Sequence, residues 1–411
     1  MTPDTALSEA SVAVVNEAGR GFPPPEPRAE ALRLELADGL DLRGPDADAL
    51  AALIAQRPHC GVFMSRAWLS GFFKDPPAGC RAHLAIFREG EALRGLAPLG
   101  LRAGGGQNCV TLLGGGAGSD RTDLLASRGF EPRCADLLLA WLRDRFGASG
   151  FVLRLRDVPQ DSALWAAMHR LARDNQVALA PREVHAGPFL NVRESRALAS
   201  TGLAAAMVLQ ESLRRHRRWL DRRGHVRIEI LRDPGEALDA FDTLRGFLHE
   251  RWRSAGGESA ADDVYRQRFN RHAIPLLLAD DYLRMVRISV DLRTVAVVYG
   301  LAAGSWWGAY LVGYDRPWAG RIHLGRLALG CAIELSAQEG AVEFDFLKGA
   351  EPVKYLWPVR ERTTLDADVY SSRTRPQLTR AVHASREMAA ALGNAARHLV
   401  SRHVSRGSRR R

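Results

Sequence analysis

The chain has little lysine and little cysteine for its 411 residues. Three of its 57 basic residues are lysines, namely Lys74, Lys348 and Lys354, and the others are arginines. Its five cysteines form no CxxC pair and have no histidine at metal-ligand spacing, which argues against a disulfide framework or a zinc site. We therefore expect no metal.

Other signals are also missing from the sequence. It has no uninterrupted apolar run of about 18 residues, so no transmembrane helix is expected. No secretory signal is expected from the acidic, weakly apolar first residues, and the sequence has no GxSxG, HExxH or Walker-type motif. The glycine-rich segment 104–120 lacks the strand–GxGxxG–helix context of a dinucleotide site and predicts flexible loops around a strand. A cytoplasmic location is the default expectation.

The positive charge is concentrated at one end of the chain. The formal net charge is +10, yet residues 371–411 hold ten arginines and one acid, so the rest of the chain is nearly neutral. A neutral body does not predict nucleic-acid binding. The tail is predicted to be a basic helix whose apolar stripe either lies on an anionic membrane surface or packs on the body. That stripe consists of Leu378, Val382, Ala389, Leu392, Ala396 and Leu399.

The sequence predicts four segments and two halves of similar organisation. Residues 1–28 form a proline-rich disordered leader, residues 29–190 and 191–370 form the two halves, and residues 371–411 form the tail. In each half, helices precede antiparallel strands, which are followed by a helix and a further strand. The first half has predicted strands at 32–36, 83–89, 93–102, 109–114 and 151–155. The second half has predicted strands at 283–291, 295–303, 306–313 and 342–347, with helices at 204–223, 234–255, 263–278 and 324–339.

A glycine opens the predicted helix 324–339. Gly325 would let phosphate approach the unpaired N–H groups of the helix start, and Arg321 and Arg326 would add cationic donors. The alternative is an ordinary loop with solvated arginines.

The strand that follows this helix, and the segment after that strand, carry candidate catalytic residues. Asp345 is expected to be either a general base or the structural partner of an arginine on helix 204–223. Tyr355 is expected either to donate a proton to a leaving thiolate or to be a packed aromatic residue. Lys354 is expected either to contact a phosphate or a substrate carboxylate, or to be an ordinary surface lysine.

These features occur in an ordered series. Tyr314–Asp315 is followed by Gly325, by Gly340 with the Glu343–Phe346 strand, and by a segment that contains Gly349, Glu351, Lys354 and Trp357. The series resembles GNAT-type acyltransferases associated with cellulose and exopolysaccharide biosynthesis, and more distantly Fem-type aminoacyltransferases. The resemblance implies an α/β (α+β) fold of tandem GNAT-like domains, with mixed, largely antiparallel sheets flanked by helices. The spacing from Arg321 to Gly325 is one residue longer than in the usual acyl-CoA signature, so the resemblance does not decide the identity of the acyl carrier.

The resemblance implies an acyltransferase. It would move an acyl group from acyl-CoA, with acetyl-CoA as the co-substrate, or from another thioester carrier, to an amine or hydroxyl of a small molecule or saccharide. We predict that Tyr310, Asp315, Trp252 and Arg218 contact the substrate. Two alternatives stay open, a Fem-type transferase that uses aminoacyl-tRNA and a non-catalytic scaffold in polysaccharide biosynthesis.

Overall fold

The computed structural model describes residues 30–102, 108–194, 204–254, 264–319 and 321–371. The predicted leader and the apolar stripe of the tail lie outside these residues. Within them, no helix is both long and apolar enough to cross a membrane.

The first half follows the predicted order of elements up to residue 173. Ser65 caps the helix that begins at Arg66, accepting a hydrogen bond from the Trp68 backbone N–H at 3.2 Å, and Trp68 and Phe72 on that helix are buried. The elements are β1 (Leu32–Ala37), α1 (Pro45–Gln56), α2 (Pro58–Gly61), α3 (Arg66–Lys74), β2 (Arg81–Glu89), β3 (Ala92–Arg102), β4 (Asn108–Leu112), β5 (Leu125–Ala126), α4 (Glu131–Phe146), β6 (Phe151–Pro159), α5 (Ala163–Arg173) and β7 (Val177–Asn191).

The second half also matches its prediction closely. Gly340 follows the last helix with a positive φ of 83°, the left-handed conformation that glycine adopts freely after a helix end. The elements are α7 (Ala204–Asp221), β8 (Val226–Ile230), α8 (Pro234–Ser254), α9 (Val264–Ala279), β9 (Leu283–Val290), β10 (Arg293–Ala303), β11 (Trp306–Tyr314), α10 (Arg316–Ala319), α11 (Leu324–Gln338), β12 (Glu343–Asp345) and β13 (Arg360–Ser371).

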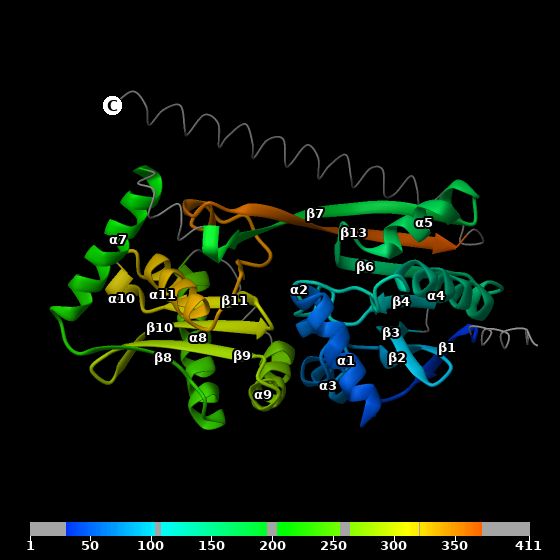
Figure 1. Ribbon diagram of the computed structural model, residues 1–411, viewed down its shortest axis with the longest axis horizontal. Coiled ribbons are helices and arrows are strands. Elements are labelled where there is room, and N and C mark those ends of the chain that lie inside the picture. Colours follow the sequence, from blue (N-terminus) through cyan, green and yellow to red (C-terminus); the bar gives the residue numbers. More distant parts are fainter. Residues whose placement is uncertain (1–29, 103–107, 195–203, 255–263, 320, 372–411) are drawn as a thin grey trace, which may run out of the picture.

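All these strands join one mixed sheet that runs through both halves. The order is β1-β2-β3-β4-β6-β13-β7-β12-β11-β10-β9-β8, and β5 pairs with β3. Most neighbouring strands are antiparallel, while β4 with β6 and β11 with β12 are parallel. Helices flank the sheet in both halves (Figure 1). The predicted mixed α/β class is confirmed.

Two strands that the sequence did not predict connect the halves. Strand β7 pairs with β13 over most of its length and with β12 at its end, where Asn191 faces Glu343. Strand β13, the last described element, lies between β6 and β7 in the sheet of the first half. Figure 1 shows β7 and β13 running together from one half to the other. The chain therefore returns to its first half after completing the second.

The two halves also share a hydrophobic core. Trp68 of α3 packs edge-on against Phe269 of α9 and Tyr310 of β11, with ring centroids 5.0 and 5.4 Å apart. Gly71 makes this approach close, because a Cβ atom there would lie 2.4 Å from the Phe269 ring. Trp68 is fully buried. The halves are thus held in one fixed relation at the level of β11.

Candidate active site

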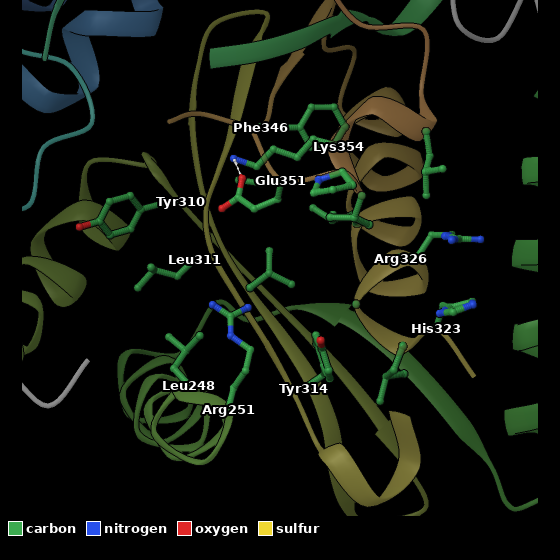
Figure 2. Close-up of a pocket in the computed structure, with 18 of the residues that line it drawn as sticks. Leu248, Arg251, Tyr310, Leu311, Tyr314, His323, Arg326, Phe346, Glu351 and Lys354 are labelled. Carbon is green, nitrogen blue, oxygen red and sulfur yellow. Dashed lines mark ion pairs between the residues drawn. The ribbon is translucent and has the colours of Figure 1, made fainter. Parts of the chain in front are cut away.

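Strands β11 and β12 pair briefly and then separate. Residues 306–308 pair in parallel with residues 343–345, and beyond Gly308 no strand in the described part of the chain pairs with this edge of β11. A pocket of about 500 Å³ fills the space between β11, the beginning of α11 and the segment from Phe346 to Leu356 (Figure 2). The main chain of β11 therefore offers hydrogen-bonding groups along one side of the pocket.

The beginning of α11 forms one end of the pocket. Gly325 lines it, and a Cβ atom there would lie 2.6 Å from the Tyr314 ring, so glycine permits the close packing of α11 on β11. His323 and Arg326 also line the pocket, and Figure 2 shows their side chains pointing the same way from the helix start. Unpaired N–H groups and the helix dipole make this end of the pocket favourable for an anion.

Two buried polar atoms without partners occur near the beginning of α11, one on Arg326 and one on His216, which lies outside the pocket lining. The His216 side chain of α7 is 7% exposed, and its ring lies 5.6 Å from that of His323. Within the described residues, neither His216 Nδ1 nor Arg326 Nε has a hydrogen-bond partner. Burial lowers the pKa of His216, and the nearby charges of His323, Arg326 and Arg215 lower it further. An anion would relieve this accumulation of positive charge and provide acceptors.

Lys354 stands at the other end of the pocket. Its ammonium Nζ donates to the carbonyl oxygens of Leu347, Lys348 and Gly349 at 3.4, 2.8 and 3.2 Å, and forms an ion pair with Glu351 at 2.9 Å. Figure 2 shows this pair beside the pocket. The lysine is therefore not a free surface residue, because it holds the segment after β12 in its turn.

Tyr310 marks an irregularity in β11. Ala309 faces Gly300 of β10 and Leu311 faces Tyr299, which leaves Tyr310 as one extra residue in the strand. Its side chain lines the pocket, and its hydroxyl donates to the carbonyl oxygen of Gly118, in the first half, at 2.6 Å. Burial raises the pKa of this hydroxyl well above its usual value. A residue that lines the pocket of the second half is therefore held in place by a hydrogen bond to the first half.

Asp345 does not line this pocket. Its carboxylate is fully buried and accepts hydrogen bonds from Arg121 at 2.6 Å, from Arg362 at 3.0 Å and from Trp306 Nε1 at 3.3 Å. Burial alone would raise its pKa, but Arg121 and Arg362 hold the pKa below its usual value. A carboxylate so paired is a poor proton acceptor. This geometry corresponds to the structural-pair alternative, although the arginines come from outside helix α7.

Tyr355 and Arg321 also lie apart from the pocket lining. The Tyr355 side chain is 41% exposed, and its hydroxyl donates to Glu361 at 2.5 Å, which raises its pKa to about 12. Arg321 is exposed in the loop before α11. In this structure neither residue lies where the predicted proton donor or phosphate ligand would be needed.

The predicted substrate contacts are spread over the second half. Asp315 is buried in an ion pair with Arg293 at 2.6 Å, and Arg218 is exposed on α7, 3.5 Å from Glu211. Neither lines the pocket, whereas Tyr310 does. Trp252 belongs to α8, but its side chain lies outside the described residues.

Several acids gather where the first half meets the pocket. Lys348, which lines the pocket, places its ammonium 2.5 Å from Asp157 and donates its backbone N–H to Asp120 at 3.2 Å. Asp157, His185 and Asp366 have ligand-type atoms within 4.8 Å of one another, an arrangement compatible with a metal ion. The Lys348 ammonium already supplies a positive charge to this cluster. The geometry of the cluster therefore fits an ion-pair network as well as it fits a metal site.

The glycine run 114–118 presents one of these acids. Instead of the predicted flexible loop, it forms a turn in which the Ser119 N–H donates to the Gly114 carbonyl oxygen at 3.0 Å. Gly114 has a φ of 98°, and a Cβ atom there would lie 2.2 Å from Ser119 Oγ. Glycine is therefore required. The turn leads directly to Asp120.

The sequence interpretation did not assign a role to His216 or Asp120. His216 lies in the segment SLRRHRRWLDRRG and Asp120 lies in the segment GSDRTDLL. No spacing rule connects these segments with Gly325 or Lys348, because the approach of the two halves brings them together.

Comparison with known proteins agrees with this geometry. Residues 209–355 match the family model of the acetyltransferase (GNAT) domain. These residues include β11, α11, β12 and almost all of the pocket lining. The second half of the chain is thus similar to GNAT acyltransferases. A sequence comparison with curated proteins finds no match.

Solved structures align with about four fifths of the chain. A conserved protein of unknown function from Bacteroides thetaiotaomicron aligns with a TM-score of 0.51 at 13% identity, covering 82% of this chain and 99% of that one. FemX aligns with a TM-score of 0.51 at 12% identity, covering 78% and 95%. A tandem GNAT protein from the clavulanic acid biosynthesis pathway aligns with a TM-score of 0.45 at 14% identity, covering 83% and 99%. At these identities the first two alignments show the fold.

Proposed function

We propose that the second half transfers an acyl group from acyl-CoA to an amine or hydroxyl of a small-molecule or saccharide acceptor. The observation that carries this proposal is the separation of β11 from β12 at the beginning of α11, which opens a pocket beside a free strand edge. A GNAT-family match over the same residues supports it.

The two ends of the pocket suit the two parts of coenzyme A. The pantetheine arm is an extended chain with two amides, and such a chain can pair with the free edge of β11 as an added strand would. The phosphates would lie at the beginning of α11, where Gly325 permits a close approach. Arg326 and His216 would then gain acceptors for the nitrogen atoms that now lack partners.

The acceptor would approach from the side of the first half. Tyr310 reaches Gly118 there, and Lys348 reaches Asp120 and Asp157. A boundary lined by carboxylates and carbonyl oxygens favours an acceptor with cationic or hydroxyl groups, such as an amine or an amino sugar. We also propose that the acceptor belongs to polysaccharide biosynthesis and that it is bound at a membrane.

A second candidate is transfer from aminoacyl-tRNA. The structural likeness to FemX extends to the fold alone, but α7 presents Arg214, Arg215 and Arg218 as exposed residues that could contact nucleic-acid phosphates. The two carriers would use different surfaces, the pocket for coenzyme A and the exposed arginines of α7 for tRNA.

Thermal unfolding with each carrier tests the proposal. Acetyl-CoA, longer acyl-CoAs and free coenzyme A at 100 times their dissociation constants should stabilise the protein by about 2.7 kcal/mol. Arg326→Gln should weaken this effect, and Arg218→Gln, which changes an exposed arginine outside the pocket lining, should not. If charged tRNA stabilises the protein and the acyl-CoAs do not, and if Arg218→Gln removes the effect of tRNA, the carrier is aminoacyl-tRNA and not acyl-CoA.

A further inference from the structure

Asp120 differs from the other acids at the boundary between the halves because it has no cation. Asp345 pairs with Arg121, Asp123 pairs with Arg57 at 3.0 Å, and Asp157 pairs with Lys348. Among the residues that the structure describes, no nitrogen of Lys, Arg or His lies within 4.0 Å of the Asp120 carboxylate. Its hydrogen bond comes from the Lys348 backbone N–H at 3.2 Å.

This unpaired carboxylate adjoins the pocket wall. Lys348, which donates to it, lines the pocket, and so does Tyr310, whose hydroxyl binds Gly118 two residues before Asp120. The charge of Asp120 is close enough to raise the pKa of the Tyr310 hydroxyl, after the larger effect of burial. The glycine turn 114–118 fixes the approach of Asp120 from the first half.

We propose that Asp120 is the general base that accepts the proton of an acceptor amine during acyl transfer. The inference rests on the proposed function, and it means that each half supplies part of the reaction: the second half binds the carrier, and the first half activates the acceptor. An acid paired with arginine, like Asp345, could not do this, because the arginine stabilises the carboxylate against protonation.

The electrostatics of the site suit this role. The pKa of Asp120 is raised to about 6, chiefly by burial and in smaller part by the charge of Asp157, against the opposing effects of the Lys348 N–H, Arg121 and Lys354. A base with a pKa near the working pH is both deprotonated and able to accept a proton.

The step balances without another reactant. The amine nitrogen attacks the thioester carbonyl carbon, a C–N bond forms and the C–S bond breaks. The proton from nitrogen goes to the Asp120 carboxylate, the thiolate leaves with a proton from water, and Asp120 later returns its proton to water. The products are an amide and coenzyme A.

Kinetics with acetyl-CoA and glucosamine at pH 5–9 provide the first test. The wild type should gain activity with a midpoint near pH 6, the pKa of Asp120. Asp120→Asn should lower kcat by roughly 10²-fold, remove this acid limb and leave the KM for acetyl-CoA unchanged. Asp161→Asn, which changes an exposed acid of the same half, should behave as wild type, and Asp120→Glu should recover part of the activity. Turnover of Asp120→Asn within threefold of wild type, or an unchanged acid limb, would overturn the proposal.

Affinity labelling tests the position of Asp120 if glucosamine is not accepted. Bromoacetyl-CoA carries a reactive carbon at the acyl position and should esterify a carboxylate beside it. Mass spectrometry should find the label on Asp120 in the wild type and not in Asp120→Asn. A protein that is stabilised by bromoacetyl-CoA but stays unlabelled at Asp120 would contradict the role of Asp120 alone. If neither acetyl-CoA nor bromoacetyl-CoA stabilises the wild type, the proposed function itself fails, and the role of Asp120 fails with it.

Discussion

Arg121 of the first half and Asp345 of the second half form a buried ion pair, with Arg121 Nη1 2.6 Å from the Asp345 carboxylate. Their side chains are 2% and 0% exposed. Arg121 follows Asp120 in the chain, and Asp345 ends β12, directly before the segment that lines the pocket. The pair therefore fixes the position of Asp120 relative to the pocket. Its role is to hold the two halves in register.

Asp345→Asn should destabilise the protein, because it leaves the Arg121 guanidinium buried without a counter-charge. Removing one partner of a buried pair costs about 3–5 kcal/mol. Urea unfolding should show the loss, and loss of soluble protein would be its extreme form. Glu361→Gln, in an exposed acid, serves as the control. An Asp345→Asn protein as stable as wild type but without turnover would instead restore the sequence-based interpretation of Asp345 as the base.

Gly325→Ala should weaken acetyl-CoA binding by at least roughly tenfold, about 1.4 kcal/mol. The added Cβ would lie 2.6 Å from the Tyr314 ring, so the ring or the helix start must move where the phosphates are proposed to bind. Gly246→Ala is a matched control in helix α8, because nothing lies within 4 Å of a Cβ there. Calorimetric titration of both variants measures the difference. Equal affinities would show that the carrier binds elsewhere.

The sequence predicts local structure well and contacts between the halves poorly. The helix predicted at 324–339 is observed at Leu324–Gln338, because helix starts and ends have their own residue preferences. Strand β7 was missed because Pro181 and Pro188 interrupt its apolar pattern, and β13 was missed because it is polar. Both strands depend on pairing with distant residues. The partner of Asp345 was mistaken for the same reason, since Arg121 lies 224 positions away.

Tyr355→Phe should leave turnover within about twofold of the wild type. The hydroxyl it removes binds Glu361 at an exposed position and does not line the pocket. Surface changes of this kind usually alter free energies by at most about 0.5 kcal/mol. Steady-state kinetics with acetyl-CoA over pH 6–9 would test this. A large fall in kcat with unchanged KM would return Tyr355 to the role of proton donor and require the 346–356 segment to move during turnover.

Asp368→Asn should reduce the sensitivity of the fold to acid. The Asp368 carboxylate is 4% exposed and binds the guanidinium groups of Arg156 and Arg182, which connect β13 with β6 and β7. Burial acts to raise its pKa, but the two arginines hold it below the usual value. A depressed pKa in the folded state means that the unfolded chain takes up the proton first as pH falls. The stabilisation by Asp368 is therefore complete above the ordinary aspartate pKa of about 3.9 and is lost as pH falls through the folded value.

The asparagine variant removes this ionisation together with the charge-assisted hydrogen bonds. At pH 7 it should be about 1–3 kcal/mol less stable than wild type, and the gap should narrow towards pH 3 because the wild type loses its advantage there. Thermal unfolding from pH 3 to 7 measures both effects, with Asp144→Asn, in an exposed acid on α4, as the control. A gap that stays constant with pH would mean that Asp368 acts through packing and not through its charge.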